Sequence, residues 1–377
     1  MAPDELQAWL RLLQTPFIGR GTARRLLAAF GSPQGVFDAS PDALRAVVNA
    51  KSAAALNTPP PELNALFDAT TAWLNADDAV AKHHVISLGD PHYPKALLET
   101  ADPPLLLYAQ GDIRLLQRLP TTLAVVGSRN PTPQGLETAR LFSEQASRAG
   151  LTIVSGLALG IDAAAHEGAL SGTSSGAAPG QAATIAVVGT GLDRVYPSRH
   201  LKLAHRIAAQ GLMLSEYPLG TSPLPANFPQ RNRIIAGLAR ATLVVEAALP
   251  SGSLITAKQA MEAGRDVLAV PGSIHSPLSR GCHMLIKQGA KLVDSAQDVL
   301  EEFGQAAGAA SATSAVNPDD TPHPLLEALG YDPVSLDALS ARTGRSAADL
   351  SSALLELELE GRVNRLPGQL FQRCDQA

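Results

Sequence analysis

From about residue 121 the chain repeats short, continuously apolar runs separated by stretches of helical periodicity. The runs are TLAVVG, LTIVSG, TIAVVG, LMLSE, ATLVVEA, DVLAVPG and KLVD, and several of them end in glycine. Strands buried on both faces of a parallel sheet have this pattern, because neither face meets water. The pattern predicts a doubly wound, mostly parallel, Rossmann-like α/β sheet. Strand and turn signals in the preceding VISLGDPHYP extend this domain to residues 76–302.

Residues 1–75 instead alternate helical periodicity with short breaks, and PFIGRGTARRLLAAF predicts a helix, a glycine-containing hairpin and a second helix. This predicts a small helical domain of the helix-hairpin-helix or SAM-like kind. Two interpretations of the hairpin at 19–25 remain open. Its amides and arginines could meet a DNA phosphate, or the domain could serve packing and protein contacts.

The C-terminal part begins after a small-residue stretch, residues 303–322, which predicts an interdomain linker, and SGTSSGAAPGQAA at 171–183 predicts a flexible loop. Residues 323–377 show helix, turn, helix and two short strands, the order of a winged-helix domain. Its would-be recognition helix, SAADLSSALLELELEG, carries four carboxylates and no Lys or Arg. Such a helix would repel a phosphate backbone, which favours a protein-contact or autoregulatory role.

Composition adds limits to this picture. With 377 residues and 45% apolar content, the chain can bury a sizeable core. No apolar run approaches the roughly 20 residues of a membrane span, and no secretory signal is evident, so we expect a soluble, cytoplasmic protein. Cys282 and Cys374 stand far apart, and neither a disulfide framework nor a metal site is expected.

The charge is unevenly distributed. Residues 121–300 hold 15 Lys and Arg against 11 Asp and Glu, which leaves 15 against 24 for the rest of the chain. A mildly basic module in a chain of net charge -5 indicates a local anion site rather than a broad basic surface.

In an open parallel sheet, ligands bind beyond the carboxyl ends of the strands. There the sequence offers amides, hydroxyls and cations in GSRNPTP, SGLALGID and PSGSLITAK. The usual nucleotide fingerprints fail, since GTGLDR lacks the third glycine of GxGxxG and GLALGID lacks the P-loop lysine. The loops are therefore suited to hold phosphate without acting on it, and no cofactor is expected.

The connection after the fourth strand carries NFPQRN, residues 227–232, followed by Arg233. Arg231 and Arg233 are two residues apart and would not share a helix face. At a loop-to-helix junction they could splay toward neighbouring phosphates, while Phe228 offers a ring for base stacking. Alternatively, Phe228 packs inward and the arginines pair with Glu216 or Glu246.

Three titratable side chains near the strand ends could suggest chemistry. His166 has no second ligand at metal spacing, so a buried structural histidine is expected. Asp162 is expected to cap its helix, and Glu246 to orient Arg231 or Arg233.

Six motifs in order resemble the DprA (Smf) DNA-processing proteins. They are GSRNPTPQG, IVSGLALGIDAAAH, VVGTGLDRVYPSRH, SEYPLGTSPLPANFPQRNRIIAGLA, LVVEAALPSGSLITAKQAMEAGRDVLAVPG and GCHMLIKQGAKLV. The resemblance implies a protein of natural transformation (competence) and DNA recombination, not an enzyme, that binds and protects single-stranded DNA and loads RecA. It also implies a homodimer formed through the α/β domain near GCHMLIKQGA, where His283 replaces a more usual Asn.

The resemblance places the DNA pocket on Arg129, the glycines of SGLALG, and Phe228, Arg231, Asn232 and Arg233. Together with the neighbouring strand-end residues, the candidate DNA-binding residues are Gly127, Ser128, Arg129, Ser155, Gly156, Gly160, Phe228, Arg231, Asn232, Arg233, Ser251, Gly252, Ser253 and Lys258.

A second hypothesis is a nucleotide-hydrolysing enzyme of the phosphoribohydrolase type, because related α/β folds place Arg and Glu at the same strand ends. Those enzymes carry a PGGxGTxxE pattern. This chain has LPSGSLITAK there, without the glutamate.

Overall fold

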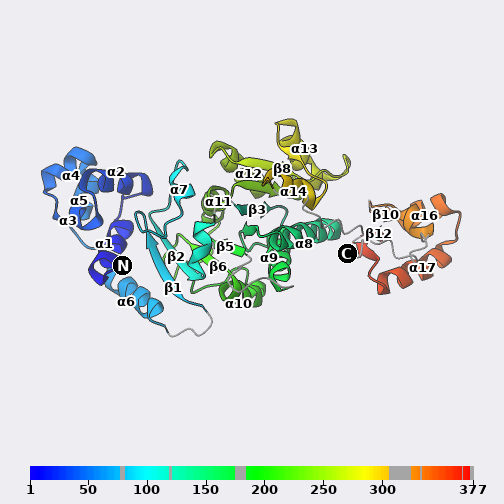
Figure 1. Ribbon diagram of the computed structural model, residues 1–377, viewed down its shortest axis with the longest axis horizontal. Helices are drawn as coiled ribbons and strands as arrows, with labels where there is room; N and C mark the ends of the chain where they lie inside the picture. Colours follow the sequence, from blue (N-terminus) through cyan, green and yellow to red (C-terminus); the bar gives the residue numbers. More distant parts are fainter. Residues whose placement is uncertain are drawn as a thin grey trace.

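The computed structural model describes residues 1–76, 81–118, 121–174, 184–304, 324–331, 333–366 and 368–373. Along the chain it contains a helical part, a large α/β part and a small part of helices and strands (Figure 1). The predicted fold class is confirmed. Most of the Gly-rich loop and the linker fall outside the described residues, as does Cys374.

Short helices with proline or polar caps at their starts build the N-terminal part. Ser32 and Ser40 accept hydrogen bonds from backbone amides in the first turns of their helices, and each precedes a proline whose missing N–H costs nothing there. Gly31 ends the second helix at φ +80°, a conformation that favours glycine. The helices are α1 (Pro3–Gln14), α2 (Arg20–Phe30), α3 (Pro33–Asp38), α4 (Pro41–Val47), α5 (Ala50–Leu56) and α6 (Leu63–Leu74).

The centre of the molecule is a nine-stranded sheet in the order β1-β2-β6-β5-β4-β3-β7-β8-β9. The seven strands predicted from the apolar runs are all present and parallel, and β1 and β2 add an antiparallel pair at one edge. The strands are β1 (His83–Ser87), β2 (Leu106–Gly111), β3 (Thr122–Val126), β4 (Thr152–Ser155), β5 (Thr184–Val188), β6 (Leu212–Ser215), β7 (Ala241–Val244), β8 (Asp266–Ala269) and β9 (Lys291–Leu292).

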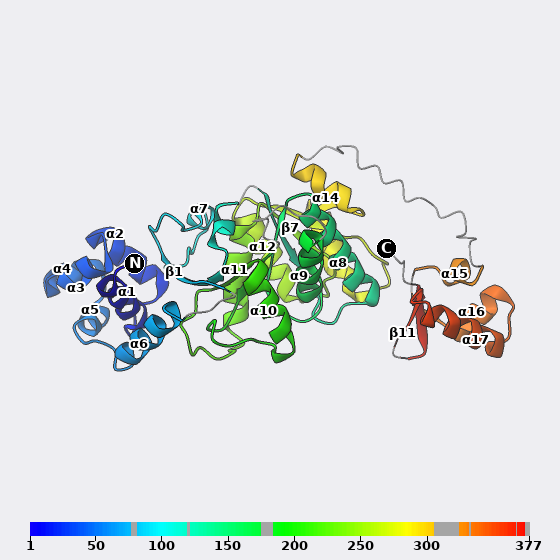
Figure 2. The same cartoon turned by 60° about the horizontal axis from the view of Figure 1, so that its bottom comes forward.

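Helices cover both faces of this sheet, which explains the continuously apolar strands. In β3, Leu123 and Val125 join the core on one face, whereas Ala124 and Val126 join the core on the other. Figure 1 shows α11, α12 and α13 above the sheet and α9 and α10 below it, and Figure 2 shows α8 beside α9. The helices are α7 (Lys95–Leu98), α8 (Pro133–Arg148), α9 (Ile161–Ser174), α10 (Leu201–Gln210), α11 (Asn227–Leu238), α12 (Gly252–Glu262), α13 (Arg280–Lys287) and α14 (Ala296–Glu302).

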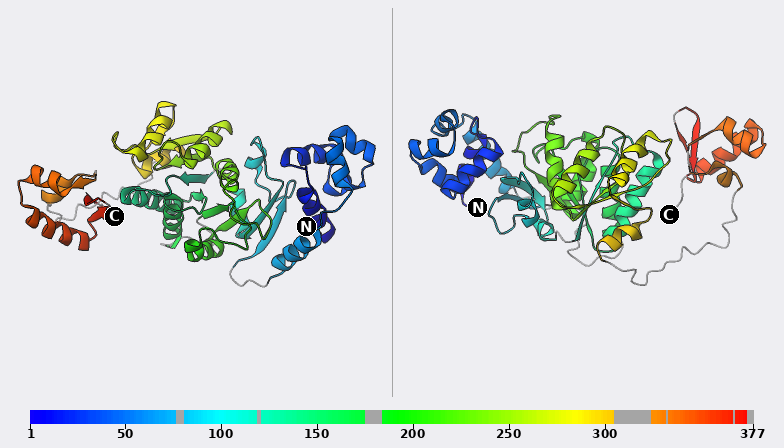
Figure 3. Two further views of the ribbon diagram at one scale, coloured as in Figure 1. Left: turned by 180° about the vertical axis from the view of Figure 1, so that it is seen from behind. Right: turned by 90° about the horizontal axis from the view of Figure 1, so that it is seen from above.

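The helical domain packs against the antiparallel edge of the sheet. Figure 3 shows α1 and α6 next to β1, and the buried side chains of Trp9 and Leu10 belong to the same core cluster as Leu106 and Tyr108 on β2. Since the two parts share a core, the sheet edge is partly covered by helices. Among the described residues, no helix is long and apolar enough to cross a bilayer.

The C-terminal part is a winged-helix domain with its own core. Three strands in the order β10-β12-β11 lie against three helices, and leucines from each helix fill the interior. Its elements are α15 (Pro324–Leu329), β10 (Val334–Ser335), α16 (Leu336–Thr343), α17 (Ala347–Leu359), β11 (Val363–Leu366) and β12 (Leu370–Arg373).

Candidate nucleic-acid interface

A pocket of about 400 Å³ lies at the carboxyl ends of β3 and β7. The chain runs from β3 outward through β4, β5 and β6, then returns to β7 on the other side of β3. This reversal is the topological switch point, where open α/β sheets bind their ligands. The lining residues are Val126, Gly127, Ser128, Arg129, Asn130, Ala158, Asp162, Arg231, Asn232, Ile235, Ala248, Pro250, Ser251, Gly252, Ser253 and Thr256.

Glycines allow the loops around this pocket to touch. A Cβ on Gly127 would lie 2.6 Å from Cγ1 of Ile161, and one on Gly160 would lie 2.4 Å from the carbonyl oxygen of Ser128. Gly160 also has φ +78°, and the amide of Ile161 donates to the Ser128 carbonyl at 3.1 Å. The sequence-predicted Gly127, Ser128 and Gly160 are thus brought together, with Gly160 supporting the loop from behind.

Glu246 does not orient an arginine, and that prediction is wrong. Its carboxylate accepts hydrogen bonds from the Thr132 amide at 2.9 Å and from the Thr132 hydroxyl at 2.6 Å. Burial raises the pKa of Glu246, and the two bonds from Thr132 oppose that shift. The residue therefore fixes the start of α8 behind the pocket.

Asp162 is bound to the loop that precedes its own helix. Its carboxylate accepts hydrogen bonds from the amides of Gly156 at 3.1 Å and Ala158 at 3.2 Å. This agrees with the predicted structural role. It also means that these two amides, which the sequence offered as anion donors, already hold an internal carboxylate.

Arg231 lines the pocket, but its guanidinium faces inward. The side chain is 3% exposed and donates to the backbone carbonyls of Gly156 and Val187 and to Oδ1 of Asn232. Burial lowers its pKa to about 10, while the charge of Asp162 opposes that shift. The guanidinium is therefore turned into the protein instead of splayed outward, with Nε and Nη1 engaged by protein acceptors.

Two other predicted residues lie outside the pocket lining. Ser155 is fully buried at the end of β4 and donates to the Val125 carbonyl at 2.7 Å. Lys258 lies on the outer side of α12, with its side chain 73% exposed and 3.7 Å from Glu262. Gly252 and Ser253, at the start of the same helix, do line the pocket.

Arg129 is the exposed cation of the site. Its guanidinium lies 5.7 Å from the ring centre of Phe228, and no carboxylate in the described ranges lies within ion-pair distance of it. The Phe228 ring in turn lies 5.5 Å from the ring of Tyr196, which is 49% exposed. Tyr196 was missed by the sequence reasoning, although it stands within the VYPSRH motif. Arg129 thus joins a polar pocket to an accessible aromatic pair.

Phe228 occupies the first turn of a helix rather than a loop. Helix α11 begins at Asn227, whose side chain donates to the Gly189 carbonyl at 3.0 Å. Pro229 then falls where a helical N–H has no partner in any case. The ring is half-buried against Gly189, where an added Cβ would lie only 3.2 Å from Cδ1 of Phe228. The ring therefore packs against Gly189 and also lies beside Tyr196 and Arg129.

Arg233 turns away from the pocket into an ion-pair network, as the alternative interpretation predicted. It pairs with Glu216 and, at 3.2 Å, with Asp102. Asp102 also pairs with Arg20 at 2.7 Å and Arg24 at 2.5 Å. The two hairpin arginines thus dock the helical domain on the sheet domain, which favours the packing interpretation of that hairpin.

Neutralising Asp102 is expected to weaken this docking. In Asp102→Asn, Arg20 and Arg233 keep Glu216 as a carboxylate partner while Arg24 loses its ion pair, and we expect the free energy of unfolding in urea to fall by about 1–2 kcal/mol. The matched control is Asp112→Asn, whose carboxylate pairs with the exposed Arg114. Equal losses in both variants would contradict a role for Asp102 in holding the domains together.

His166 is a buried structural histidine, as predicted. It is fully buried, and Nδ1 lies 2.7 Å from the Thr184 hydroxyl. His283 uses Nε2 to contact the Gly272 carbonyl at 3.0 Å. In the part of the chain that the structure describes, no cluster of three or more His, Cys, Asp or Glu side chains could hold a metal ion.

The structure is thus an open α/β sheet with a polar switch-point pocket, an exposed arginine and an aromatic pair, flanked by two smaller domains. Comparison with known families makes this specific. Residues 84–304 match the family described as DNA recombination-mediator protein A, residues 3–60 a DprA-like N-terminal HHH domain, and residues 309–369 the DprA winged helix domain. The chain belongs to the DprA family of DNA recombination-mediator proteins.

Individual relatives agree over most of the chain. Protein Smf of Escherichia coli is 42% identical over 311 residues, which cover 80% of this chain and 79% of that protein. DNA processing protein DprA of Streptococcus pneumoniae is 51% identical over 217 residues, covering 58% and 73% of the two chains.

Solved structures give the same result. The crystal structure of DprA from S. pneumoniae has a TM-score of 0.66 and 38% identity, covering 80% of this chain and 98% of that one. DNA processing protein A from Helicobacter pylori, whose structure concerns its unique single-stranded DNA binding mode, has a TM-score of 0.52 and 30% identity, covering 59% and 95%.

Proposed function

We propose that this chain binds single-stranded DNA at the switch-point pocket and the adjoining aromatic pair. The observation that carries the proposal is the position of Arg129, an exposed guanidinium between the pocket and Phe228. A phosphate fits the arginine and the hydroxyl-rich loops, while a neighbouring base can stack on Phe228 or Tyr196. The H. pylori relative, described as binding single strands, supports this assignment.

Single strands should be preferred to duplex. Stacking on an aromatic ring requires a base that is not held in a double helix, whereas phosphate contacts alone would accept either form. The pocket side chains at Ser128, Asn232, Ser251 and Ser253 complete the polar surface in this proposal. Gly156, Gly160, Ser155 and Arg231 then shape the pocket, and Lys258 and Arg233 lie outside the contact.

The test measures binding of fluorescein-labelled dT20 by anisotropy across a salt series, with a 20-bp duplex as competitor. We expect Arg129→Ala to weaken binding about tenfold and to reduce the salt slope by roughly 0.7, the value of one lost contact to a single strand. Phe228→Leu keeps apolar volume but removes the ring, and a similar loss is expected with little change in slope.

The matched control is Arg45→Ala, which removes an exposed arginine of the helical domain that pairs with Asp42. Binding by Arg129→Ala and Phe228→Leu as tight as that of the control would overturn the assignment of the pocket.

In the cell we propose that the DNA-bound chain protects incoming single strands during transformation and loads RecA onto them, in the cytoplasm. The family description as a recombination mediator supports this step. The direct readout is the lag in RecA ATPase on dT-rich strands coated with single-strand-binding protein. Wild type should shorten the lag and Arg129→Ala should not. A lag unchanged by a wild-type protein that still binds dT20 would remove the RecA step and leave DNA binding intact.

We further propose that the chain forms a homodimer through the α/β domain around α13. Two accessible apolar side chains near this end of the sheet support the location. They are Ile274, 76% exposed, and Leu292 on edge strand β9, 46% exposed. Two pockets on one dimer would increase the apparent affinity for a long strand.

A nucleotide-hydrolysing function is not proposed. Such a reaction needs a carboxylate that is free to act, and the carboxylates near the pocket, Asp162 and Glu246, both hold backbone amides of the protein.

A further inference from the structure

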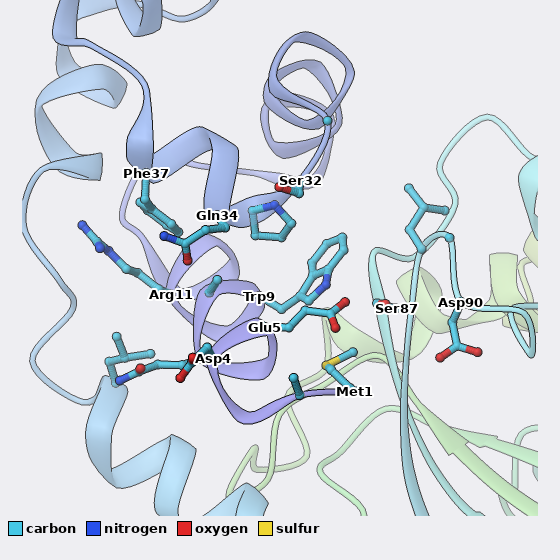
Figure 4. Close-up of a pocket in the computed structure, with 18 of the residues that line it drawn as sticks. Met1, Asp4, Glu5, Trp9, Arg11, Ser32, Gln34, Phe37, Ser87 and Asp90 are labelled. Carbon is cyan, nitrogen blue, oxygen red and sulfur yellow. The ribbon is translucent and has the colours of Figure 1, made fainter.

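A second and larger cavity lies far from the DNA pocket, between the helical domain and the start of the sheet. Its volume is about 1140 Å³, and it is lined by α1, the segment from Gly31 to Phe37, the start of α6, and the loop at 87–91 that follows β1. Figure 4 shows this space opening between α1 and the strand that carries Ser87. We call it the α1–β1 cleft. Pockets for small ligands rarely exceed 1,000 Å³, so its size fits a polymer segment better than a metabolite.

Acidic side chains outnumber basic ones in the lining of this cleft. Asp4 and Glu5 lie exposed on its α1 side with no ion-pair partner within the described ranges. Asp90 lines the cleft from the loop after β1, where its Oδ1 accepts a hydrogen bond from the amide of His92 at 2.7 Å. Arg11 is the basic side chain in the lining, and its guanidinium already contacts other groups of the protein. It donates to the Leu56 carbonyl at 2.8 Å and lies 3.9 Å from the ring centre of Phe37. A strand of phosphates would be repelled here, whereas a cationic group would be attracted.

A buried donor gives the cleft a second, independent feature. Trp9 is 4% exposed, and its Nε1–H finds no acceptor among the described residues. Figure 4 shows the indole at the cleft wall with its nitrogen edge on the side of Glu5. A buried indole N–H normally finds an acceptor, because leaving it unpaired is unfavourable. The carbonyl oxygen of an incoming peptide backbone is a suitable acceptor for this N–H, and it carries no net charge.

Part of the remaining wall is apolar and contains two prolines. Pro33, Pro59, Leu63 and Leu88 line it together with Met1. Prolines and packed leucines offer a preformed surface that loses little entropy on binding.

We propose that the α1–β1 cleft binds a short segment of a partner protein that carries Lys or Arg. One backbone carbonyl of that segment accepts from Trp9, its basic side chains meet Asp4, Glu5 and Asp90, and its apolar side chains pack on the proline-rich wall. The site is separate from the DNA pocket, so a bound strand and a bound peptide can be present together.

The first experiment uses the full chain and a bead-bound library of random octapeptides made from Lys, Arg, Asp, Glu, Leu, Ala and Gly. We expect retained beads to be at least threefold richer in Lys and Arg than in Asp and Glu. No enrichment, or enrichment of acidic peptides, would overturn the proposal.

The second experiment measures the affinity of the most enriched peptide, labelled with fluorescein. Asp4→Asn with Glu5→Gln should weaken it at least tenfold, and Trp9→Phe, which keeps a ring but removes the N–H, about fivefold. The matched control is Asp42→Asn with Asp68→Asn, which removes the same charge from exposed positions of the helical domain outside the cleft. Equal affinity in cleft and control variants would contradict the site.

DNA binding, thermal unfolding and competition experiments serve as controls for the peptide measurement. All variants should bind dT20 as wild type does. Asp4 and Glu5 are exposed, so their double variant should unfold at the wild-type temperature, whereas Trp9→Phe shortens a buried side chain and is compared at a temperature where both proteins are folded. Competition by dT20 would place the peptide on the DNA pocket instead. Displacement of the labelled peptide by spermidine at the same concentration as the peptide would show that the cleft binds polyamines in general. Either outcome sinks the peptide proposal.

Discussion

Replacing Arg231 with methionine is expected to lower the free energy of unfolding by about 3–5 kcal/mol. The guanidinium is sealed in the protein, where it donates to the carbonyls of Gly156 and Val187 and lies near the charge of Asp162. Methionine fills a similar volume but leaves both carbonyls without this donor and a buried carboxylate without its cation. Urea unfolding followed by circular dichroism measures the loss.

The matched control is Arg129→Met, because Arg129 is exposed and lies without a carboxylate partner in the described part of the chain. We expect its stability to change by less than about 0.5 kcal/mol. A loss of less than about 1 kcal/mol in Arg231→Met would contradict the structural role assigned to Arg231. Because Arg231→Met disturbs the fold, weaker DNA binding by that variant would not identify a DNA contact, and Arg129 is the better residue for that purpose.

The sheet could be predicted almost completely from the sequence. Seven apolar runs correspond to seven strands. Those covered by helices on both faces carry apolar side chains at nearly every position, whereas β9 lies exposed at the edge of the sheet. The switch point followed from the same reasoning, since the loops after β3 and β7 carry the Gly127–Arg129 and Ser251–Ser253 segments that line the pocket.

The direction of each arginine in α11 could not be predicted. The spacing of Arg231 and Arg233 correctly places them on different sides of a helix. Which side is buried depends on Gly156 and on Asp102, both far away in the sequence, and neither signals this partnership by its local pattern. Tertiary contacts therefore decided the roles of both arginines.

The direction of Lys258, in contrast, could be predicted from the sequence of its own helix. In α12 the buried positions are Ser253, Thr256, Ala257 and Ala260, which share one side of the helix. Lys258 falls on the other side, and helical periodicity alone would have removed it from the candidate site.

A drop in pH from 7 to 5 is expected to cost about 2 kcal/mol of stability through His166 alone. Burial, then the charges of Arg231 and His200, lower the pKa of His166 to about 3, compared with 6.5 in the unfolded chain. The Thr184 hydroxyl donates to the Ile153 carbonyl at 2.8 Å, so it accepts from a neutral His166 whose Nδ1 carries the proton. Adding a second proton would place an unpaired cation in the core.

The sign follows from which state binds the proton. Between pH 6.5 and about 3 the unfolded chain protonates at this position and the folded chain does not, so stability falls as the pH falls. The stability is fully present above pH 6.5. The loss approaches about 1.4 kcal/mol per pH unit within that window.

Urea unfolding at a series of pH values tests this with two substitutions. His166→Asn keeps an N–H for Thr184 but cannot titrate, so its stability should depend on pH with a slope smaller by about one proton between about pH 6 and pH 4. His275→Asn changes an exposed histidine and should keep the wild-type slope. If both variants follow the wild type, the acid sensitivity arises elsewhere and His166 is not held neutral by the fold. If only the stability of His166→Asn becomes less pH-dependent, protonation of His166 accounts for the acid sensitivity of the core behind the pocket. The charge of the buried Arg231 helps to keep this histidine neutral.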